Sequence, residues 1–337
     1  MDLNTAWFIL VGVLLTGYAI LDGFDLGVGV WHLFARDDKA RRAYMRAIGP
    51  VWDGNEVWLL TAGGALFAAF PIVYATVFSG FYLALMLLLT ALIFRAVSLE
   101  LRGKVASPRW TRAWDWGFGL GSLVAVVLLG VALGNILRGV PIDETGAFTG
   151  SFLGLLNPYA LFMGVVTLLL LTMHGAAYLT AKTDGELAAR MRTSVSGVWA
   201  AFIVAYVVLA CVTPFAAPFL FDGLLKKPLF WVFFAAQLAG LVCVPVSARA
   251  GRGLPVFLAS SVVIAGLAGL VAVGLFPRLT PSSTNLAYSL TIYNAASTPR
   301  TQTVMLVIAL MGMPLVVAYT AFVYWVFRGK ATGEESY

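Results

Sequence analysis

The chain has 337 residues, of which 61% are hydrophobic and 11% are charged, whereas soluble domains carry about 25% charged residues. This composition excludes a soluble globular protein and predicts an all-α polytopic membrane protein. The net charge of +6 does not indicate a nucleic-acid binder, because the basic residues lie in short stretches between long apolar runs. In that position they report membrane topology.

Nine apolar runs are long enough to cross a membrane as helices. Most of the 22 Lys and Arg residues lie in the connections that follow the odd-numbered runs and in the C-terminal segment. The positive-inside rule therefore places the N-terminus outside and the C-terminus in the cytoplasm. In chain order the runs cover residues 6–34, 48–70, 74–95, 114–137, 152–181, 196–221, 229–248, 254–277 and 302–327.

The first run contains two carboxylates, Asp22 and Asp25, which are its only acidic groups. Their spacing of three residues places them on one face of a helix. A carboxylate at the middle of a membrane helix costs about 2.5–3.5 kcal/mol on insertion scales. Such a pair either takes up protons or faces a hydrated, protein-lined path, and both outcomes indicate ion or proton handling.

The second run repeats this spacing with Asp53 and Glu56. Asp22 lies about 24 Å along the first helix from its outer end, and Asp53 and Glu56 lie about 8 and 12 Å from the inner end of the second. All these acids therefore fall in the cytoplasmic half. We predict that Asp53, Asp22, Asp25 and Glu56 are proton-transfer groups open to the cytoplasm.

The alternative for each acid in these runs is a structural ion pair with a nearby arginine. That alternative is favoured for Glu100 and Asp115, which lie at the inner ends of the third and fourth runs. The basic residues Arg95, Arg102 and Arg112 accompany them, and all three are assigned to the inner connection.

Few residues are available to hold a metal or a redox cofactor. His32 and His174 lie on separate runs, and a haem subunit needs several axial ligands at matched depths. Both are expected to be hydrogen-bonded packing groups, and Cys211 and Cys243 to be small buried apolar residues. GFGLGS at 117–122 opens a run rather than following a strand, so it indicates packing. The chain is expected to contain no metal, cofactor or catalytic residue of its own.

Several long motifs resemble subunit II of the cytochrome bd-type quinol oxidases, and together they extend over nearly the whole chain. They are GYAILDGFDLGVG in the first run, AIGPVWDGNEVWLLTAGGALFAAFP from Ala47, WDWGFGLGS from Trp114, LLNPYALFMG from Leu155, FPRLTPSSTNLAYSLTIYNAAST from Phe276, and YWVFRGK near the end.

The resemblance implies a heterodimer of two nine-span subunits in the bacterial cytoplasmic (inner) membrane. Each subunit would comprise two four-helix bundles and a peripheral helix. Here these correspond to residues 1–138, residues 139–277, and an outer loop with a ninth helix at 278–337. Subunit I would carry the quinol site, two b-type haems and a third haem of d or b type. The complex would oxidise quinol and reduce oxygen to water with cytoplasmic protons.

The resemblance also suggests finer features. The family allows a structural quinone in this subunit and a small accessory subunit in the complex. The short link at 222–228 favours the cyanide-insensitive branch, in which the third haem need not be d-type. The family's proton-delivery aspartates fall on Asp53 and on the Asp22/Asp25 pair, with Asp22 preferred and Asp25 left open. Trp52 and Trp58 accompany the motif and are expected to pack.

Two other functions fit the residues. Buried acids beside glycine-rich helices also suit a stand-alone proton-coupled transporter. A purely structural scaffold is the third hypothesis, and it predicts that neutralising the acids has no effect.

Overall fold

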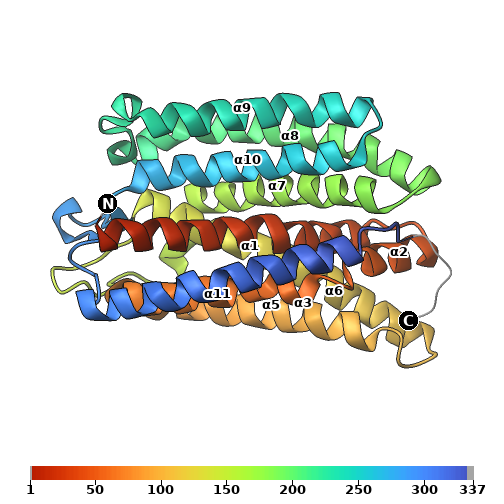
Figure 1. Cartoon of the computed structure of the whole chain (residues 1–337), viewed down its shortest axis with the longest axis horizontal. Helices are drawn as coiled ribbons and strands as arrows, with labels where there is room; N and C mark the ends of the chain where they lie inside the picture. Colours follow the sequence, from red (N-terminus) through yellow and green to blue (C-terminus); the bar gives the residue numbers. More distant parts are fainter. Residues whose placement is uncertain (1, 332–337) are drawn as a thin grey trace.

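The computed structural model describes residues 2–331, and eight helices there are long and apolar enough to cross a membrane. They lie alongside one another in one elongated bundle, with the start of α1 and the end of α11 at opposite ends (Figure 1). This arrangement confirms an all-α polytopic membrane protein. The eight are α1 (Leu3–Leu33), α5 (Tyr82–Leu101), α6 (Pro108–Arg138), α7 (Pro158–Lys182), α8 (Gly185–Ala216), α9 (Pro228–Arg249), α10 (Gly253–Leu275) and α11 (Pro299–Val326).

The second predicted run forms α3 (Trp52–Ala69), which packs along α1. Its 18 residues span about 27 Å. Its first five residues include Asp53, Asn55 and Glu56. Its 18 residues are therefore less apolar than the most apolar 18-residue stretch of each of the eight helices above. A total of nine crossings therefore stays a prediction.

The predicted third run, residues 74–95, has the wrong bounds. The chain forms α4 (Pro71–Gly80), turns at Phe81, and then forms α5. The loop between α6 and α7 holds α4, since Thr76 donates a hydrogen bond to the Gly146 carbonyl at 2.7 Å. The crossing helix is α5, and it continues six residues beyond Arg95. Arg95 therefore lies within the bundle and not in the inner connection.

Smaller elements lie at the two ends of the bundle. The connection after α1 forms α2 (Asp38–Ile48), where Asp37 caps the helix by accepting a hydrogen bond from the Ala40 amide at 2.7 Å. At the opposite end a two-stranded antiparallel sheet joins β1 (Arg278–Thr280) and β2 (Leu290–Thr291). The 3₁₀ helices are η1 (Leu153–Leu155), η2 (Pro218–Phe221), η3 (Leu224–Lys226) and η4 (Leu286–Tyr288).

Helix α1 lies centrally and contacts α3, α6, α7 and α10. Its backbone lies directly against that of α7, because a Cβ at Gly27 would lie 2.0 Å from the Leu171 carbonyl oxygen. Small residues permit such backbone contact between membrane helices. The opposite face of α1, which carries Asp22 and Asp25, is also enclosed by protein, since both aspartates have 0% exposure.

The two cysteines are exposed on the sides of α8 and α9, so the prediction that Cys211 and Cys243 are buried is wrong. A helix that crosses a membrane is apolar both where it packs and where it meets lipid. Apolar surroundings in the sequence therefore do not identify its buried face.

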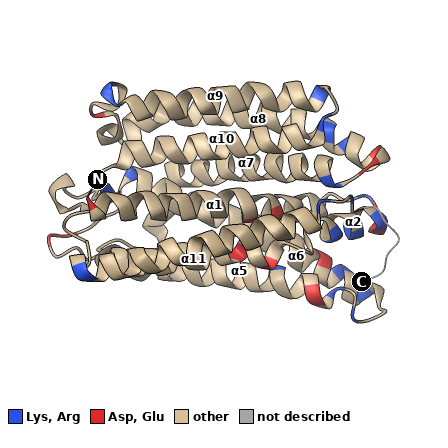
Figure 2. Ribbon diagram, viewed as in Figure 1, with Lys and Arg blue, Asp and Glu red and all other residues tan. Residues whose placement is uncertain are grey.

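Lys and Arg are concentrated at the end of the bundle that carries α2, and few lie at the other end (Figure 2). This distribution follows the expected positive-inside pattern. The assignment of the α2 end to the cytoplasm stays a prediction.

Candidate functional site

Four charged side chains meet inside the bundle, and we call them the buried charge cluster. Asp22, Asp25 and Arg95 have 0% exposure, and the Glu56 side chain is 22% exposed. Asp22 and Asp25 come from α1, Glu56 from α3 and Arg95 from α5. The structure thus brings three of the four predicted proton-transfer residues together around an arginine.

Arg95 contacts all three carboxylates of the cluster. Its Nη2 donates a hydrogen bond to Asp22 Oδ1 at 2.6 Å and lies 3.9 Å from Asp25 Oδ2. Its Nη1 lies 3.9 Å from Glu56 Oε2. Three carboxyl groups therefore share one guanidinium, so a fully ionised cluster would hold excess negative charge in a protein-enclosed region.

Neutral polar groups complete the surroundings of Asp25. The Asn55 side-chain amide donates to Asp25 Oδ2 at 2.7 Å, and the Tyr324 hydroxyl donates to Asn55 Oδ1 at 3.0 Å. The first of these hydrogen bonds links α3 to α1, and the second links α11 to α3. Asp22 Oδ2 and Asp25 Oδ1 accept no hydrogen bond from the described residues, although buried polar atoms are usually satisfied by protein or ordered water.

Asp53 lies outside the cluster, although it precedes Glu56 by only three residues on α3. It is exposed on the surface of the chain, beside an apolar face that includes the exposed residues Leu60 and Phe67. Trp58 packs instead, since a Cβ at Gly17 would lie 2.4 Å from its ring. Trp52 is half-buried.

Sequence reasoning missed Arg95, Asn55 and Tyr324. For Arg95 a signal was present, because the residues after it, AVSLEL, can continue the helix of the preceding apolar run. An arginine inside a membrane helix marks a functional site by default. Asn55 and Tyr324 have no such signal, because their contacts depend on how α1, α3 and α11 pack.

A second polar network lies at the α2 end of the bundle. Asp115 Oδ1 lies 2.7 Å from His32 Nε2 and accepts from Arg102 Nε at 2.6 Å, and Arg102 Nη2 donates to Asp38 at 2.5 Å. The predicted helix-end pairing of Asp115 is confirmed. For Glu100 it is wrong, because this exposed residue forms no ion pair within residues 2–331.

Burial raises the pKa of Asp38, but hydrogen bonds from Arg102 and from the next turn of α2 hold that pKa below its ordinary value.

The second histidine is a hydrogen-bonded packing group, as predicted. His174 is fully buried, with Nδ1 2.7 Å from Ser260 Oγ and Nε2 2.9 Å from the Ile20 carbonyl oxygen. Its ring stacks on Phe257 at 5.0 Å. Both ring nitrogens therefore have hydrogen-bond partners, so neither is available as an axial haem ligand. In the described part of the chain no three or more His, Cys, Asp or Glu residues are grouped so as to hold a metal ion.

Comparison with known proteins gives one consistent result. The family model for cytochrome bd terminal oxidase subunit II matches residues 3–327. Cytochrome bd-I ubiquinol oxidase subunit 2 of Escherichia coli K12 is 39% identical over 367 residues, which cover 99% of this chain and 96% of that protein. Cytochrome bd ubiquinol oxidase subunit 2 of Bacillus subtilis 168 is 36% identical over 336 residues, which cover 99% of this chain and 98% of that protein.

The fold is also known from a solved structure. The structure of bd oxidase from Geobacillus thermodenitrificans matches with a TM-score of 0.81 at 17% identity and covers 97% of this chain and 99% of that chain. These relatives support an oxidase subunit and do not support the stand-alone transporter. With a family model that matches almost the entire length, the chain belongs to the cytochrome bd terminal oxidase subunit II family.

Proposed function

We propose that this chain is the non-haem subunit of a respiratory quinol oxidase that reduces oxygen to water. In this proposal it supports a haem-bearing subunit I and delivers protons to that subunit from the cytoplasmic end of the bundle. The relatives are named as ubiquinol oxidase subunits, which supports the overall reaction. The observation that carries the proton path is the enclosure of three carboxyl groups around a single arginine.

The composition of the cluster suits proton transfer. With three carboxyl groups and one guanidinium, the cluster can bind a proton without leaving an unpaired positive charge in the bundle. By the geometry of residues 2–331, Asp22 Oδ2 and Asp25 Oδ1 accept no hydrogen bond, and carboxylate oxygens of this kind bind ordered water or a proton. A hydrated chain of such groups carries protons.

The path proposed from the cluster to the surface follows α3. Glu56 contacts Arg95 at 3.9 Å and is partly exposed, and Asp53 is exposed three residues nearer the α2 end. An exposed carboxylate beside exposed Leu60 and Phe67 is unfavourable against lipid. We therefore propose that subunit I covers this face of α3 and exchanges protons with Asp53.

The proposed division of the chain follows the position of the cluster. Residues 1–138 would form the bundle that contains the proton path, residues 139–277 a supporting bundle, and residues 278–337 the outer loop and peripheral helix. The α2 end would face the cytoplasm of a bacterium. Subunit I would carry two b-type haems and a third haem of d or b type. The family also allows a structural quinone in this subunit and a small accessory subunit.

The substitution Asp53→Asn tests the path. We expect the complex to assemble with its haem absorbance intact but to consume oxygen more slowly, because the carboxylate proposed to exchange protons with subunit I is lost. Glu144→Gln is the matched control, since Glu144 is an exposed acid in the outer-side loop. Normal turnover in Asp53→Asn, with all haems in place, would contradict the proton role and favour the scaffold hypothesis.

A further inference from the structure

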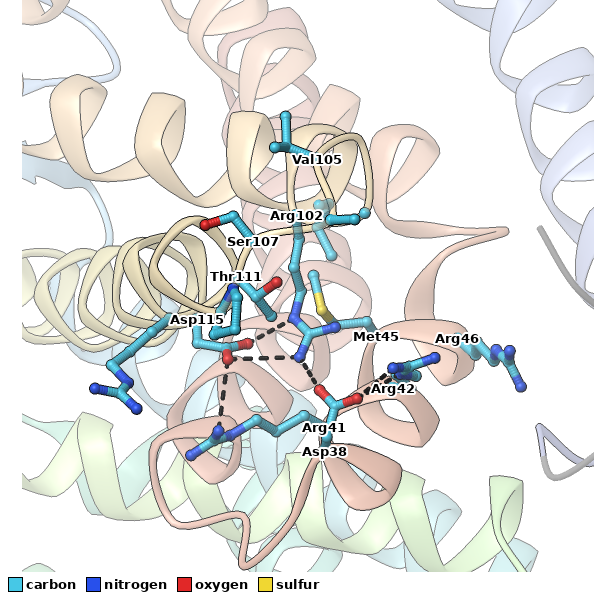
Figure 3. A pocket seen from close by; sticks show the side chains of 15 residues that line it. Asp38, Arg41, Arg42, Met45, Arg46, Arg102, Val105, Ser107, Thr111 and Asp115 are labelled. Atoms are coloured by element: carbon cyan, nitrogen blue, oxygen red, sulfur yellow. Dashed lines mark hydrogen bonds and ion pairs between the residues drawn. The ribbon is translucent and has the colours of Figure 1, made fainter.

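A pocket of about 820 Å³ opens at the α2 end of the bundle, away from the buried charge cluster. It lies between α2, the end of α5, and the loop that leads into the start of α6 (Figure 3). Its volume falls within the range of about 300–1,000 Å³ typical of ligand sites. Five arginines line it: Arg41, Arg42, Arg46, Arg102 and Arg112.

The two acidic residues of the pocket are already engaged. Asp38 accepts from Arg102 at 2.5 Å on one oxygen and from Arg42 at 2.6 Å on the other. Asp115 is bound by Arg102 at 2.6 Å and by His32 at 2.7 Å. Figure 3 shows the bonds that join Arg102 to Asp115 and Asp38 and the bond from Arg42 to Asp38. With Arg46 left aside, the four other arginines and the two aspartates leave a formal excess of two positive charges.

Donors remain available after these pairs have formed. Arg41 lies 3.5 Å from Asp115 through Nη1, while its buried Nε has no hydrogen-bond partner among the described residues. Arg112 is exposed and forms no ion pair within residues 2–331. Arginine N–H groups bind phosphate in bidentate geometry more strongly than neutral donors do.

The N-terminus of α6 adds a fixed positive partial charge to the pocket. This helix of 31 residues begins at Pro108, and its N-cap residue Ser107 makes no side-chain capping bond. Ser107, Pro108 and Thr111 all line the pocket. The first amides of a long helix favour an anion, so the helix end and the arginines act in the same direction.

We propose that this arginine pocket is a binding site for a phosphate group. Trp110 and Trp114 lie in the first turns of α6, 5.5 Å apart, and tryptophans are enriched where membrane meets water. An anionic phospholipid head group is therefore one source of the phosphate, and a soluble phosphate compound is the other. Basic pockets between membrane helices suit both.

Residue-resolved chemical protection tests the proposal on the intact complex. Phenylglyoxal modifies accessible arginines, and peptide mass spectrometry gives the rate at each position. The complex would be treated in phosphatidylcholine nanodiscs, in nanodiscs that also contain phosphatidylglycerol, and in phosphatidylcholine nanodiscs with inorganic phosphate. Arg109 is the internal control, because it is exposed on the same turn of α6 but does not line the pocket.

We expect modification of Arg41 and Arg112 to slow severalfold while Arg109 is unchanged. Protection by phosphatidylglycerol alone identifies a lipid site, and protection by inorganic phosphate alone identifies a soluble ligand. Protection by both identifies a phosphate site open to either. No protection by either probe, or equal slowing at Arg109, overturns the proposal.

A pair of variants provides an independent measurement. Arg41→Gln/Arg112→Gln removes two charges from the pocket and leaves the Arg102 bonds intact, and Lys104→Gln/Arg109→Gln removes two charges from nearby positions outside it. We expect the first variant to retain about 30-fold less phosphatidylglycerol, from the usual contribution of two basic residues at an anionic surface. Equal retention by the two variants overturns a lipid site.

Discussion

Replacing Arg95 with glutamine tests whether charge balance holds the buried charge cluster together. Arg95 lies 2.6 Å from Asp22 and 3.9 Å from both Asp25 and Glu56. Removing one partner of a buried ion pair costs about 3–5 kcal/mol, because the other charge is left uncompensated. We expect the destabilisation by Arg95→Gln to lie at the upper end of this range, since the substitution leaves three carboxyl groups without a counter-charge.

The partner substitution Asp22→Asn is expected to cost less. It removes the shortest bond but leaves Arg95 with Asp25 and Glu56 as counter-charges. The double variant Arg95→Gln/Asp22→Asn removes both halves of the closest pair. It should therefore be more stable than Arg95→Gln alone, with a coupling energy of about 0.5–3 kcal/mol, which is typical of residues in contact.

The assay is thermal unfolding of the purified oxidase complex, followed by circular dichroism and by haem absorbance. Arg249→Gln is the control, because Arg249 is an exposed arginine at the end of α9, away from the cluster. The reasoning is refuted if the double variant is as unstable as the two single variants combined. In that case the ion pair would contribute nothing beyond the separate side chains.

Three further predictions concern the surroundings of the cluster. Asp25→Asn should slow oxygen consumption with the haem spectrum intact, whereas Asp22→Asn should mainly lower thermal stability or haem incorporation; indistinguishable variants would contradict separate roles. Gly27→Ala should destabilise the complex by about 1–3 kcal/mol, because its Cβ would lie 2.0 Å from the α7 backbone. Gly63→Ala, which meets open space, should not alter the melting temperature. Tyr324→Phe should cost about 0.5–1.5 kcal/mol by removing one hydrogen bond between α11 and α3, and an unchanged melting temperature would argue against that tether.

The sequence predicts the membrane architecture well because the signal is local. Apolar runs identify eight long helices. A segment that crosses a membrane has apolar side chains and hydrogen-bonds its own backbone groups, and a helix meets both conditions. The break at Phe81 escapes this reasoning. Residues on both sides of it are equally apolar. Helix α4 ends at Gly80, where the ring of Phe148 from the loop after α6 packs closely.

The site is only partly predictable, because the depth of a residue does not identify its neighbours. Counting along the helices brings Asp22, Asp25 and Glu56 to similar depths, and the structure places them in one cluster. The same counting includes Asp53, which faces outward. Arg95 was assigned to a loop because basic residues usually mark the ends of helices; its role depends on α5 continuing to Leu101.

The contacts of the two buried aspartates give them different chemistry. Asp22 is bound at 2.6 Å by a guanidinium, which can only donate hydrogen bonds. Asp25 is bound by the side chain of Asn55, a neutral amide with both donor and acceptor atoms. After rotation such an amide can accept from a protonated carboxyl group as well as donate to a carboxylate. We therefore propose Asp25 as the proton carrier of the pair, with Asp22 holding Arg95 in position.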